Sequence, residues 1–239
     1  MTAQHPLRGD VTVLVPAAGL GTRLGPGGPK ALRQLGGVSL LVHAVRRLCE
    51  APSVGSVVVA APVGWVAEVH ALLAEQVVPA GVQLDVVEGG STRQHSVAAA
   101  LAAAPRTYPI VLVHDAARAF APTELVERVA AAVRRGHEAV IPILPVVDTI
   151  KQVDESGHVI ATLDRSVLRA VQTPQGFRRE VLEAGHRSAV DAHTDDAGLV
   201  ENLGVRVFGV LGAEAALKIT RPADLAFAEM LLRADGGVI

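Results

Sequence analysis

The segment Val11–Lys30, VTVLVPAAGLGTRLGPGGPK, holds the residues whose types and spacing first suggest chemistry. Its apolar, β-branched beginning is typical of a central strand in a parallel sheet. Glycines then recur through the loop, so its backbone can turn tightly and its amide groups can approach phosphate oxygens. Arg23 and Lys30 add positive charge to the same loop. The segment therefore predicts a site for a nucleoside triphosphate.

The glycine pattern of this segment differs from the two best-known nucleotide-binding motifs. Leu24 occupies the position of the third glycine in the dinucleotide fingerprint G-x-G-x-x-G, so a nicotinamide cofactor is disfavoured. Lys30 follows Pro29 and precedes Ala31, whereas the lysine of a P-loop follows glycine and precedes serine or threonine. Loop composition alone leaves an ordinary surface loop open as the alternative to a phosphate site.

Strand-type and helix-type segments alternate through the first part of the chain. The apolar runs predict strands at 11–15, 56–60, 82–87, 110–113 and 139–143. The amphipathic and alanine-rich stretches between them predict helices at 38–48, 65–76, 92–104 and 122–135, with Ser39 as the cap of the first. This alternation indicates an α/β, Rossmann-like fold, in which helices flank a mostly parallel central sheet.

Three unusual loops follow strands of this sheet. They span 16–30, 88–96 and 114–118, and the last reads His-Asp-Ala-Ala-Arg. Because the carboxyl ends of parallel strands lie at one edge of the sheet, we expect the three loops to converge there. Their convergence supports a ligand site more strongly than any one of them does.

The segment at about 146–169 interrupts the α/β alternation. Residues 147–153 and 158–163 alternate in polarity around a turn at 154–157, which is a β-hairpin pattern. We expect this insertion to be a protruding arm that pairs with a second subunit, because it carries many β-branched residues. The alternative is a hairpin folded flat on its own sheet.

The remainder of the chain returns to the α/β pattern. Residues 171–175 and 205–210 predict strands, and 178–189 and 222–233 predict helices. Thr194 is the expected cap of another helix, and Asp195 and Asp196 are interpreted as charges at its start, outside the site. We expect residues 1–239 to form a single domain carrying the arm as an insertion.

Composition limits the class of protein. Half of the 239 residues are hydrophobic, and the formal net charge of -2 comes from 22 basic and 24 acidic residues that are well mixed. This balance argues against a nucleic-acid or membrane-surface partner. The single cysteine, Cys49, lies in a helical pattern and is expected to be a buried hydrophobic residue. Neither a signal peptide nor a membrane-spanning run is recognisable, so we expect a cytoplasmic protein.

Eight short motifs follow one another along nearly the whole chain, and each occurs once. The set comprises Pro16-Ala17-Ala18-Gly19-x-Gly21-x-Arg23 with Pro29-Lys30, Gly89-Gly90-x-x-Arg93-x-x-Ser96, Val113-His114-Asp115-Ala116-Ala117-Arg118, Asp148-Thr149-x-Lys151, Asp164-Arg165, Thr173-Pro174-Gln175, Thr194-Asp195-Asp196 and Lys218-Ile219-Thr220-Arg221-Pro222-x-Asp224-Leu225. In this set the chain resembles the 2-C-methyl-D-erythritol 4-phosphate cytidylyltransferases of the non-mevalonate isoprenoid pathway. The first motif is shared with many nucleotidyltransferases, whereas the whole set is specific.

The resemblance implies an activity and its requirements. It implies transfer of the cytidylyl group of CTP to a sugar-alcohol phosphate, with pyrophosphate as the leaving group. It also implies a single nucleotidyltransferase domain, dependence on Mg²⁺ and a homodimer whose arm takes part in the partner's active site. Such a step needs positioning and cationic stabilisation rather than a protein nucleophile.

The same resemblance implies roles for individual residues. The cations expected around the α-phosphate and the leaving pyrophosphate are Arg23, Lys30 and Lys218. The residues expected to contact the nucleotide are Ala17, Ala18, Gly19, Gly21, Gly90, Ser91, Ser96, Asp115 and Ala116. The residues expected to bind the acceptor are Asp115, Arg118, Thr149, Arg165 and Thr173, and Asp115 is also the expected metal ligand.

Some alternatives stay open at this point. Ala119 replaces a proline that is frequent in the family, and Ser91 stands where an aspartate is frequent, which puts the ribose contact in question. The chain also resembles ribitol 5-phosphate cytidylyltransferase, whose nucleotide motifs are the same. A pyrophosphorylase that uses another base and a non-catalytic nucleotide sensor are the remaining alternatives.

Overall fold

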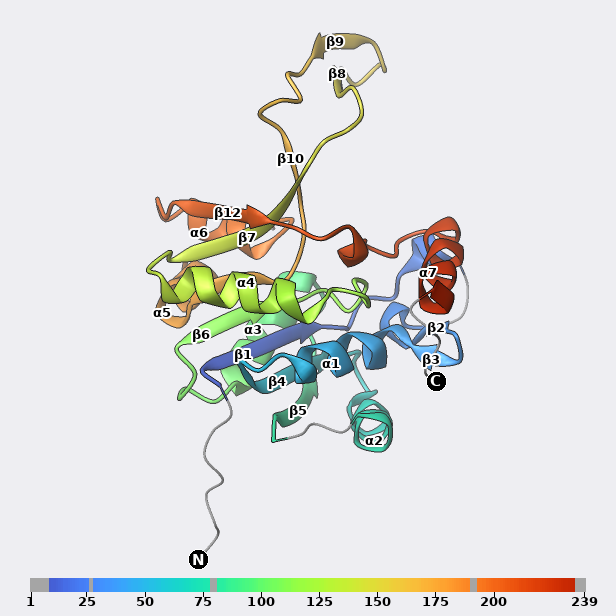
Figure 1. Cartoon of the computed structure of the whole chain (residues 1–239), viewed down its shortest axis with the longest axis vertical. Coiled ribbons are helices and arrows are strands. Elements are labelled where there is room, and N and C mark those ends of the chain that lie inside the picture. The colour runs from blue at the N-terminus through green and yellow to red at the C-terminus, as the bar shows by residue number, and fades with distance from the viewer. Residues whose placement is uncertain (1–8, 26–27, 78–80, 190–192, 235–239) are drawn as a thin grey trace, which may run out of the picture.

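Eight strands form the central sheet in the part of the chain that the structure describes (Figure 1). The computed structural model describes residues 9–25, 28–77, 81–189 and 193–234, with the side chains of Arg23 and Ala234 outside the description. The strands are β1 Val11–Pro16, β4 Val54–Ala61, β5 Gln83–Glu88, β6 Ile110–Val113, β7 Ala139–Pro145, β10 Arg169–Val171, β11 Gln175–Arg178 and β12 Val207–Leu211. Their order is β10-β7-β11-β6-β1-β4-β5, and β12 also pairs with β7.

Most neighbouring strands of the sheet run parallel. β1 pairs in parallel with β4 and β6, β4 with β5, and β12 with β7. β11 runs antiparallel to both β6 and β7, and β10 runs antiparallel to β7. The predicted mostly parallel, Rossmann-like sheet is confirmed. Its two reversed strands are those that bring the chain back from the arm.

Helices cover both faces of the sheet. Apolar residues of α1 Leu40–Glu50, α2 Val66–Gln76 and α4 Thr123–Arg134 share one buried cluster with Val11, Val13 and Val15 of β1. Residues of α3 Arg93–Ala103, α5 Arg179–Ser188 and α6 Asp196–Glu201 share another cluster with Leu14. Successive side chains of a strand point to opposite faces, so a continuous apolar strand is buried on both. Cys49 of α1 is buried, as expected.

A third apolar cluster lies at the carboxyl end of the sheet, beneath α7 Pro222–Ala234. It joins Leu24 of the short helix η1 Thr22–Leu24, Leu35, Phe120 and Ile219 to that helix. Leu35 belongs to a small hairpin, β2 Gln34–Leu35 and β3 Val38–Ser39, whose turn is Gly36-Gly37. Both glycines have positive φ, of 59° and 83°, which a tight two-residue hairpin turn requires.

Two predicted helix starts need correction. Val38 was predicted to be helical, but it belongs to β3, because the two glycines before it close the hairpin. Ser39 is confirmed as the cap of α1, since its hydroxyl accepts a hydrogen bond from Val42 N at 3.2 Å. Thr194 was the wrong choice of cap for α6. Asp195 caps that helix by accepting from Gly198 N at 3.1 Å, because its side chain is the one in register with the first free amides.

The arm is a separate two-stranded hairpin. β8 Lys151–Val153 pairs only with β9 Val159–Thr162 among the described strands, and Figure 1 shows the hairpin projecting beyond the ends of β7 and β10. The predicted protruding hairpin is therefore confirmed, and the alternative of a hairpin lying flat on its own sheet is wrong. The role of the arm in dimerisation stays a prediction.

Membrane insertion through a helix finds no support in the described residues, because none of their helices combines the length and apolar character that a bilayer requires.

Candidate active site

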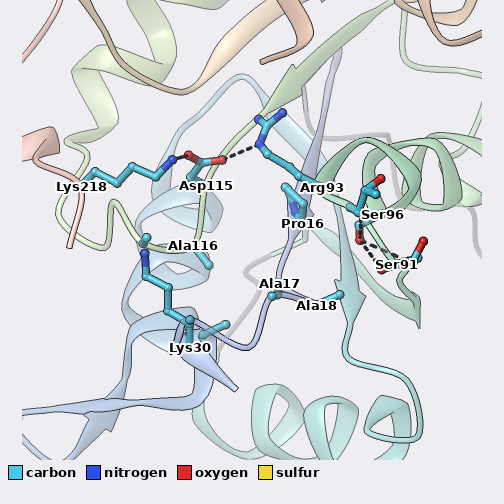
Figure 2. Close-up of a pocket in the computed structure, with 16 residues that line it drawn as sticks. Pro16, Ala17, Ala18, Lys30, Ser91, Arg93, Ser96, Asp115, Ala116 and Lys218 are labelled. Atoms are coloured by element: carbon cyan, nitrogen blue, oxygen red, sulfur yellow. Dashed lines mark hydrogen bonds and ion pairs between the residues drawn. The ribbon is translucent and has the colours of Figure 1, made fainter. Parts of the chain in front are cut away.

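A cavity of about 300 Å³ opens at the carboxyl edge of the sheet (Figure 2). The loops after β1, β5 and β6 line it, together with the segment between the short helix η3 Glu214–Ala216 and α7. Its lining residues are Pro16, Ala17, Ala18, Gly19, Gly21, Lys30, Ala31, Gly90, Ser91, Thr92, Arg93, Ser96, Asp115, Ala116, Ala117 and Lys218. The predicted convergence of the three loops is confirmed.

The loop after β1 folds back on itself and brings Lys30 to the cavity. Lys30 N donates to Gly19 O at 3.1 Å, and Gly21 between them has a φ of 65°. A Cβ atom at position 21 would lie only 2.3 Å from Lys30 Cβ. Glycine is needed there both for the left-handed backbone and for the close approach of Lys30. Lys30 begins the short helix η2 Lys30–Leu32, and its side chain is half-buried.

The loop after β5 packs closely against the loop after β1. A Cβ atom on Gly89 would lie 2.6 Å from Ala18 Cβ and 2.9 Å from Ala61 O, so only glycine allows this approach. The hydroxyl of Ser96 accepts from Gly90 N at 3.2 Å and donates to Thr92 O at 2.9 Å. These contacts fix the turn that leads into α3.

The carboxylate of Asp115, which follows β6, holds two cations at the cavity. Lys218 Nζ lies 2.7 Å from Oδ2, and Arg93 Nε lies 3.1 Å from Oδ1. Figure 2 shows the two side chains approaching the carboxylate from opposite sides. Burial by itself raises the pKa of Asp115, but the charges of Arg93 and Lys218 outweigh it and hold the pKa well below its usual range. Asp115 is therefore ionised at neutral pH.

Buried polar contacts hold the Asp115 loop from below. Asp115 N donates to Thr173 Oγ1 at 3.0 Å, and His114 Nδ1 lies 3.3 Å from the same oxygen. His114 Nε2 lies 3.3 Å from Arg118 O. Both ring nitrogens of this buried histidine therefore have a partner. The histidine joins the Asp115 loop, through Arg118 O, to Thr173 just before β11.

The segment that carries Lys218 is tied to the same loop. Ile219 N donates to Ala117 O at 2.9 Å. The guanidinium of Arg118 donates to Ala216 O at 2.6 Å and to Val171 O at 3.1 Å. These bonds place Lys218 across from Asp115 and link its segment to β10, the strand that returns from the arm.

The matches to known proteins agree with this arrangement. The family model for 2-C-methyl-D-erythritol 4-phosphate cytidylyltransferase matches residues 11–234. The chain belongs to this family of nucleotidyltransferases. The resemblance inferred from the motifs is thereby confirmed.

Individual relatives match nearly their whole length. An enzyme of the same name from Saccharopolyspora erythraea is 54% identical over 226 residues, which cover 93% of this chain and 99% of the relative. One from Streptomyces avermitilis is 49% identical over 233 residues, covering 95% and 93%. A crystal structure of the cytidylyltransferase from Thermus thermophilus is 40% identical, with a TM-score of 0.73 over 94% of this chain and 99% of that one.

The structure brings most of the cytidylyltransferase site residues predicted from the sequence to one cavity. The residues that line it are Ala17, Ala18, Gly19, Gly21, Lys30, Gly90, Ser91, Ser96, Asp115, Ala116 and Lys218. The side chain of Arg23, in η1, lies outside the described side chains. In Figure 2 Ser91 and Ser96 lie on the opposite side of the cavity from Lys218. The cavity therefore has a serine side and a separate lysine side.

The predicted acceptor residues other than Asp115 lie outside the cavity lining. Thr173 is buried and holds the backbone of Asp115, and Arg118 is buried against carbonyl groups. Thr149 and Arg165 are exposed on the arm, where the Arg165 guanidinium donates to Val147 O. Their roles toward the acceptor stay predictions.

Sequence reasoning left Arg93 and Asp196 out of the site. Arg93 lines the cavity, and its Nη1 lies 2.6 Å from Asp196 Oδ2. Arg93 was visible in the Gly89-Gly90-x-x-Arg93 motif, and Asp196 was visible beside Asp195 as a second acid at a helix start. The signal was present, but nothing local distinguishes a paired aspartate from one that interacts only with the helix dipole.

The buried His114 makes the stability of the fold depend on pH. The pKa of His114 is lowered to about 4 from an ordinary value of 6.5, chiefly because the ring is buried; the charge of Asp115 opposes this shift, and the charge of Arg118 adds to it. Between these two values the unfolded chain binds a proton that the folded chain does not, so stability falls as the pH falls.

We expect this histidine alone to lower the free energy of unfolding by about 2 to 3 kcal/mol between pH 7.5 and pH 4.5. Urea unfolding across that range should show a steeper pH dependence for the wild type than for His114→Gln, which cannot titrate. Equal slopes for the two proteins would contradict the assignment. The other histidines are the same in both chains, so their contribution cancels.

Proposed function

We propose that the chain transfers the cytidylyl group of CTP to 2-C-methyl-D-erythritol 4-phosphate, giving 4-diphosphocytidyl-2-C-methyl-D-erythritol and pyrophosphate. The observation that carries the proposal is the cavity in which Lys30, Lys218 and the glycine loops of the matched family motifs converge. A cavity with these cations and backbone amides suits a polyphosphate. We infer that residues 1–239 act as one nucleotidyltransferase domain with the arm at about 146–169 as an insertion.

The reaction is a displacement at the α-phosphorus of CTP. An oxygen of the acceptor phosphate attacks this phosphorus, the bond to the oxygen that bridges to the β-phosphate breaks, and pyrophosphate leaves with that bond's electron pair. Charge accumulates on the phosphoryl oxygens and the leaving group during the step. Lys30, Lys218 and Arg23 are the cations assigned to stabilise it, which is electrostatic catalysis by groups already in place.

The remaining parts of the cavity are assigned to the nucleoside and its position. Contacts to the cytosine and ribose, largely through backbone amides and a hydroxyl, are assigned to Ala17, Ala18, Gly19, Gly90, Ser91 and Ser96. Gly21 and Ala116 are assigned to the nucleotide without a more specific role. Ser91 Oγ lies 3.2 Å from His95 Nδ1, so its hydroxyl is directed by a neighbour on α3. A directed hydroxyl is compatible with a ribose contact at the position where the family often has an aspartate.

Mg²⁺ is the metal that the family implies, and the residues present fit it. Asp115 is the one carboxylate among the described lining residues, and it is held ionised. No group of three or more potential metal ligands occurs among the described residues. Mg²⁺ is commonly bound by one or two protein carboxylates together with substrate phosphates. The ion, when bound, would neutralise phosphate charge. Asp115 would supply the protein ligand while retaining its hydrogen bonds to the cations.

The arm is proposed to complete the acceptor site of a second copy of the chain. It exposes apolar side chains, of which Val147 is 78% and Val167 is 76% exposed. A protruding hairpin that carries such residues is suited to a contact with another subunit. In the homodimer, Thr149 and Arg165 would reach the partner's acceptor phosphate, while Arg118 and Thr173 support the site within their own subunit. We infer a cytoplasmic enzyme without nucleic-acid or membrane partners.

The first experiment measures pyrophosphate release by the purified protein with CTP and Mg²⁺. 2-C-methyl-D-erythritol 4-phosphate and ribitol 5-phosphate are compared side by side at equal concentration. We expect turnover with the former only, in line with the family match, which favours this acceptor. Turnover with ribitol 5-phosphate alone would retain the chemistry but replace the acceptor, and no turnover with either would support the nucleotide-sensor alternative.

The two lysines of the cavity are tested by the double substitution Lys30→Ala, Lys218→Ala. Removing two cations from the reacting phosphates should lower kcat by at least about 10³-fold in a protein that still folds, although loss of the pair between Lys218 and Asp115 should lower the urea midpoint. The control is Arg206→Ala, which removes an exposed cation outside the cavity and should leave kcat unchanged. Unchanged turnover in the double variant would remove both lysines from the mechanism.

The proposed contribution of the arm to the partner's site is tested by mixing two variants. Arg165→Ala should raise the KM for the acceptor by about 10-fold or more, with little effect on the KM for CTP, since it removes a charged hydrogen bond to the acceptor phosphate.

The second variant for the mixing experiment is Lys218→Ala, which should lower kcat in the site of the subunit that carries it. If the arm acts across the dimer, dissociating and mixing the two variants should restore roughly a quarter of wild-type activity at low acceptor concentration, because half the dimers are mixed and have one intact site. No restoration would mean that Arg165 serves its own subunit or neither.

A further inference from the structure

Arg93 joins two carboxylates that belong to different parts of the chain. Its Nε lies 3.1 Å from Asp115 Oδ1, and its Nη1 lies 2.6 Å from Asp196 Oδ2. Asp115 follows β6, Arg93 begins α3 and Asp196 begins α6. The contact to Asp196 joins residues 103 positions apart in the sequence. Arg93 is therefore the link between the carboxylate of the cavity and a second carboxylate behind it.

Asp196 is nearly inaccessible and is absent from the cavity lining. Its side chain is 1% exposed, whereas the side chain of Arg93 is 27% exposed. Its other oxygen, Oδ1, lies 3.2 Å from Nε2 of His186 on α5, whose side chain is 7% exposed. A buried carboxylate is stable only when it is paired and hydrogen-bonded, and both of its oxygens are. The carboxylate is thus itself held rigidly by two elements of the fold.

The four charged side chains form a row in which each one orients the next. Lys218, Asp115, Arg93 and Asp196 alternate in sign, with successive contacts of 2.7, 3.1 and 2.6 Å. The planar guanidinium can satisfy both carboxylates only in one orientation. Burial lowers the pKa of Arg93, but the charges of Asp196 and Asp115 more than reverse that shift and keep the group cationic. With Oδ1 of Asp115 occupied by Arg93, Oδ2 is the oxygen presented to Lys218.

Stability alone is a weak reason for such an arrangement, because a buried ion pair contributes little once the cost of desolvating both charges is subtracted. Its distinguishing property is orientation. We propose that Asp196 is a positioning residue for the reaction, which fixes the Arg93 guanidinium and through it the Asp115 carboxylate and Lys218. The inference rests on the proposed function, since its purpose is to hold these groups in place for phosphoryl chemistry.

The test compares Asp196→Asn with the matched control Asp195→Asn. Asparagine at 196 retains the size of the side chain and one acceptor but loses the charge that orients Arg93. Asparagine at 195 can still cap α6, where Asp195 accepts from Gly198 N, and it gives up only the bond from Gln175 Nε2, which does not involve Arg93. We expect Asp196→Asn to lower kcat about 10-fold or more and to change the KM for CTP less than about threefold, because a small displacement of reacting groups acts on the chemical step. Asp195→Asn should match the wild type.

A double-mutant cycle separates positioning from a general effect on folding. If Asp196 acts through Arg93, Asp196→Asn should cause no further loss of kcat in an Arg93→Ala background, although its effect on the urea midpoint can persist there. Full additivity of the two losses in kcat would overturn the proposal. Unchanged kcat for Asp196→Asn in an active protein would do the same, as would a loss confined to KM.

Two further measurements cover the remaining outcomes. If Asp196→Asn does not fold, Arg93→Lys is tested instead. Lysine retains the charge but lacks the planar fork, so kcat should fall by a similar factor. A kcat equal to that of the wild type would overturn the proposal.

If the wild type itself shows no turnover, the proposed function fails. The orientation is then read by NMR from hydrogen exchange at Arg93 Nε, which should be slow in the wild type and faster in Asp196→Asn. Equal exchange rates would reject the role of Asp196 independently of activity.

Discussion

The site depends on the ionised carboxylate of Asp115 and the two cations that it holds. Without it, Lys218 and Arg93 would face each other as like charges in a partly desolvated space. With it, one cation is held on each oxygen, at 2.7 and 3.1 Å. The cost of burying the carboxylate is offset by those cations, and the cations in turn lie at fixed positions before any phosphate arrives. Such preorganisation is what electrostatic catalysis requires.

The sheet supplies the positions that this interaction needs. β1, β4, β5 and β6 are neighbours and run in parallel, so the loops that follow them meet at one edge. The side chains of β1, β4 and β6 are buried on both faces by helices, whereas those of the edge strand β5 are only partly buried. The apolar cluster beneath α7 holds the segment of Lys218 close to the loop of Asp115. The apolar core thus provides the rigidity, and the loops at its edge are left to carry polar chemistry.

Sequence patterns predicted the elements of the core well because their signals are local. β6 was predicted with the same bounds that the structure has, since an apolar β-branched run of four residues between turn residues has few alternatives. The small hairpin before α1 was missed, because its strands have only two residues each and Gly36-Gly37 was not interpreted as its turn. The single strand predicted at 171–175 was wrong, because the chain forms β10 up to Val171 and β11 from Gln175. The reversed direction of these two strands was not predicted either, since strand direction depends on how the chain returns from the arm.

The sequence by itself determined the family, the alternation of strands and helices, the hairpin arm and the loops that contain the charged residues. All of these follow from periodicity, turn residues and short motifs within a few positions of one another. Tertiary structure alone decided the partners: that Arg93 joins Asp115 to Asp196, and that the guanidinium of Arg118 is directed at the carbonyl groups of Ala216 and Val171. These contacts join residues far apart in the chain, and their pairing depends on which strand ends lie side by side in the folded sheet.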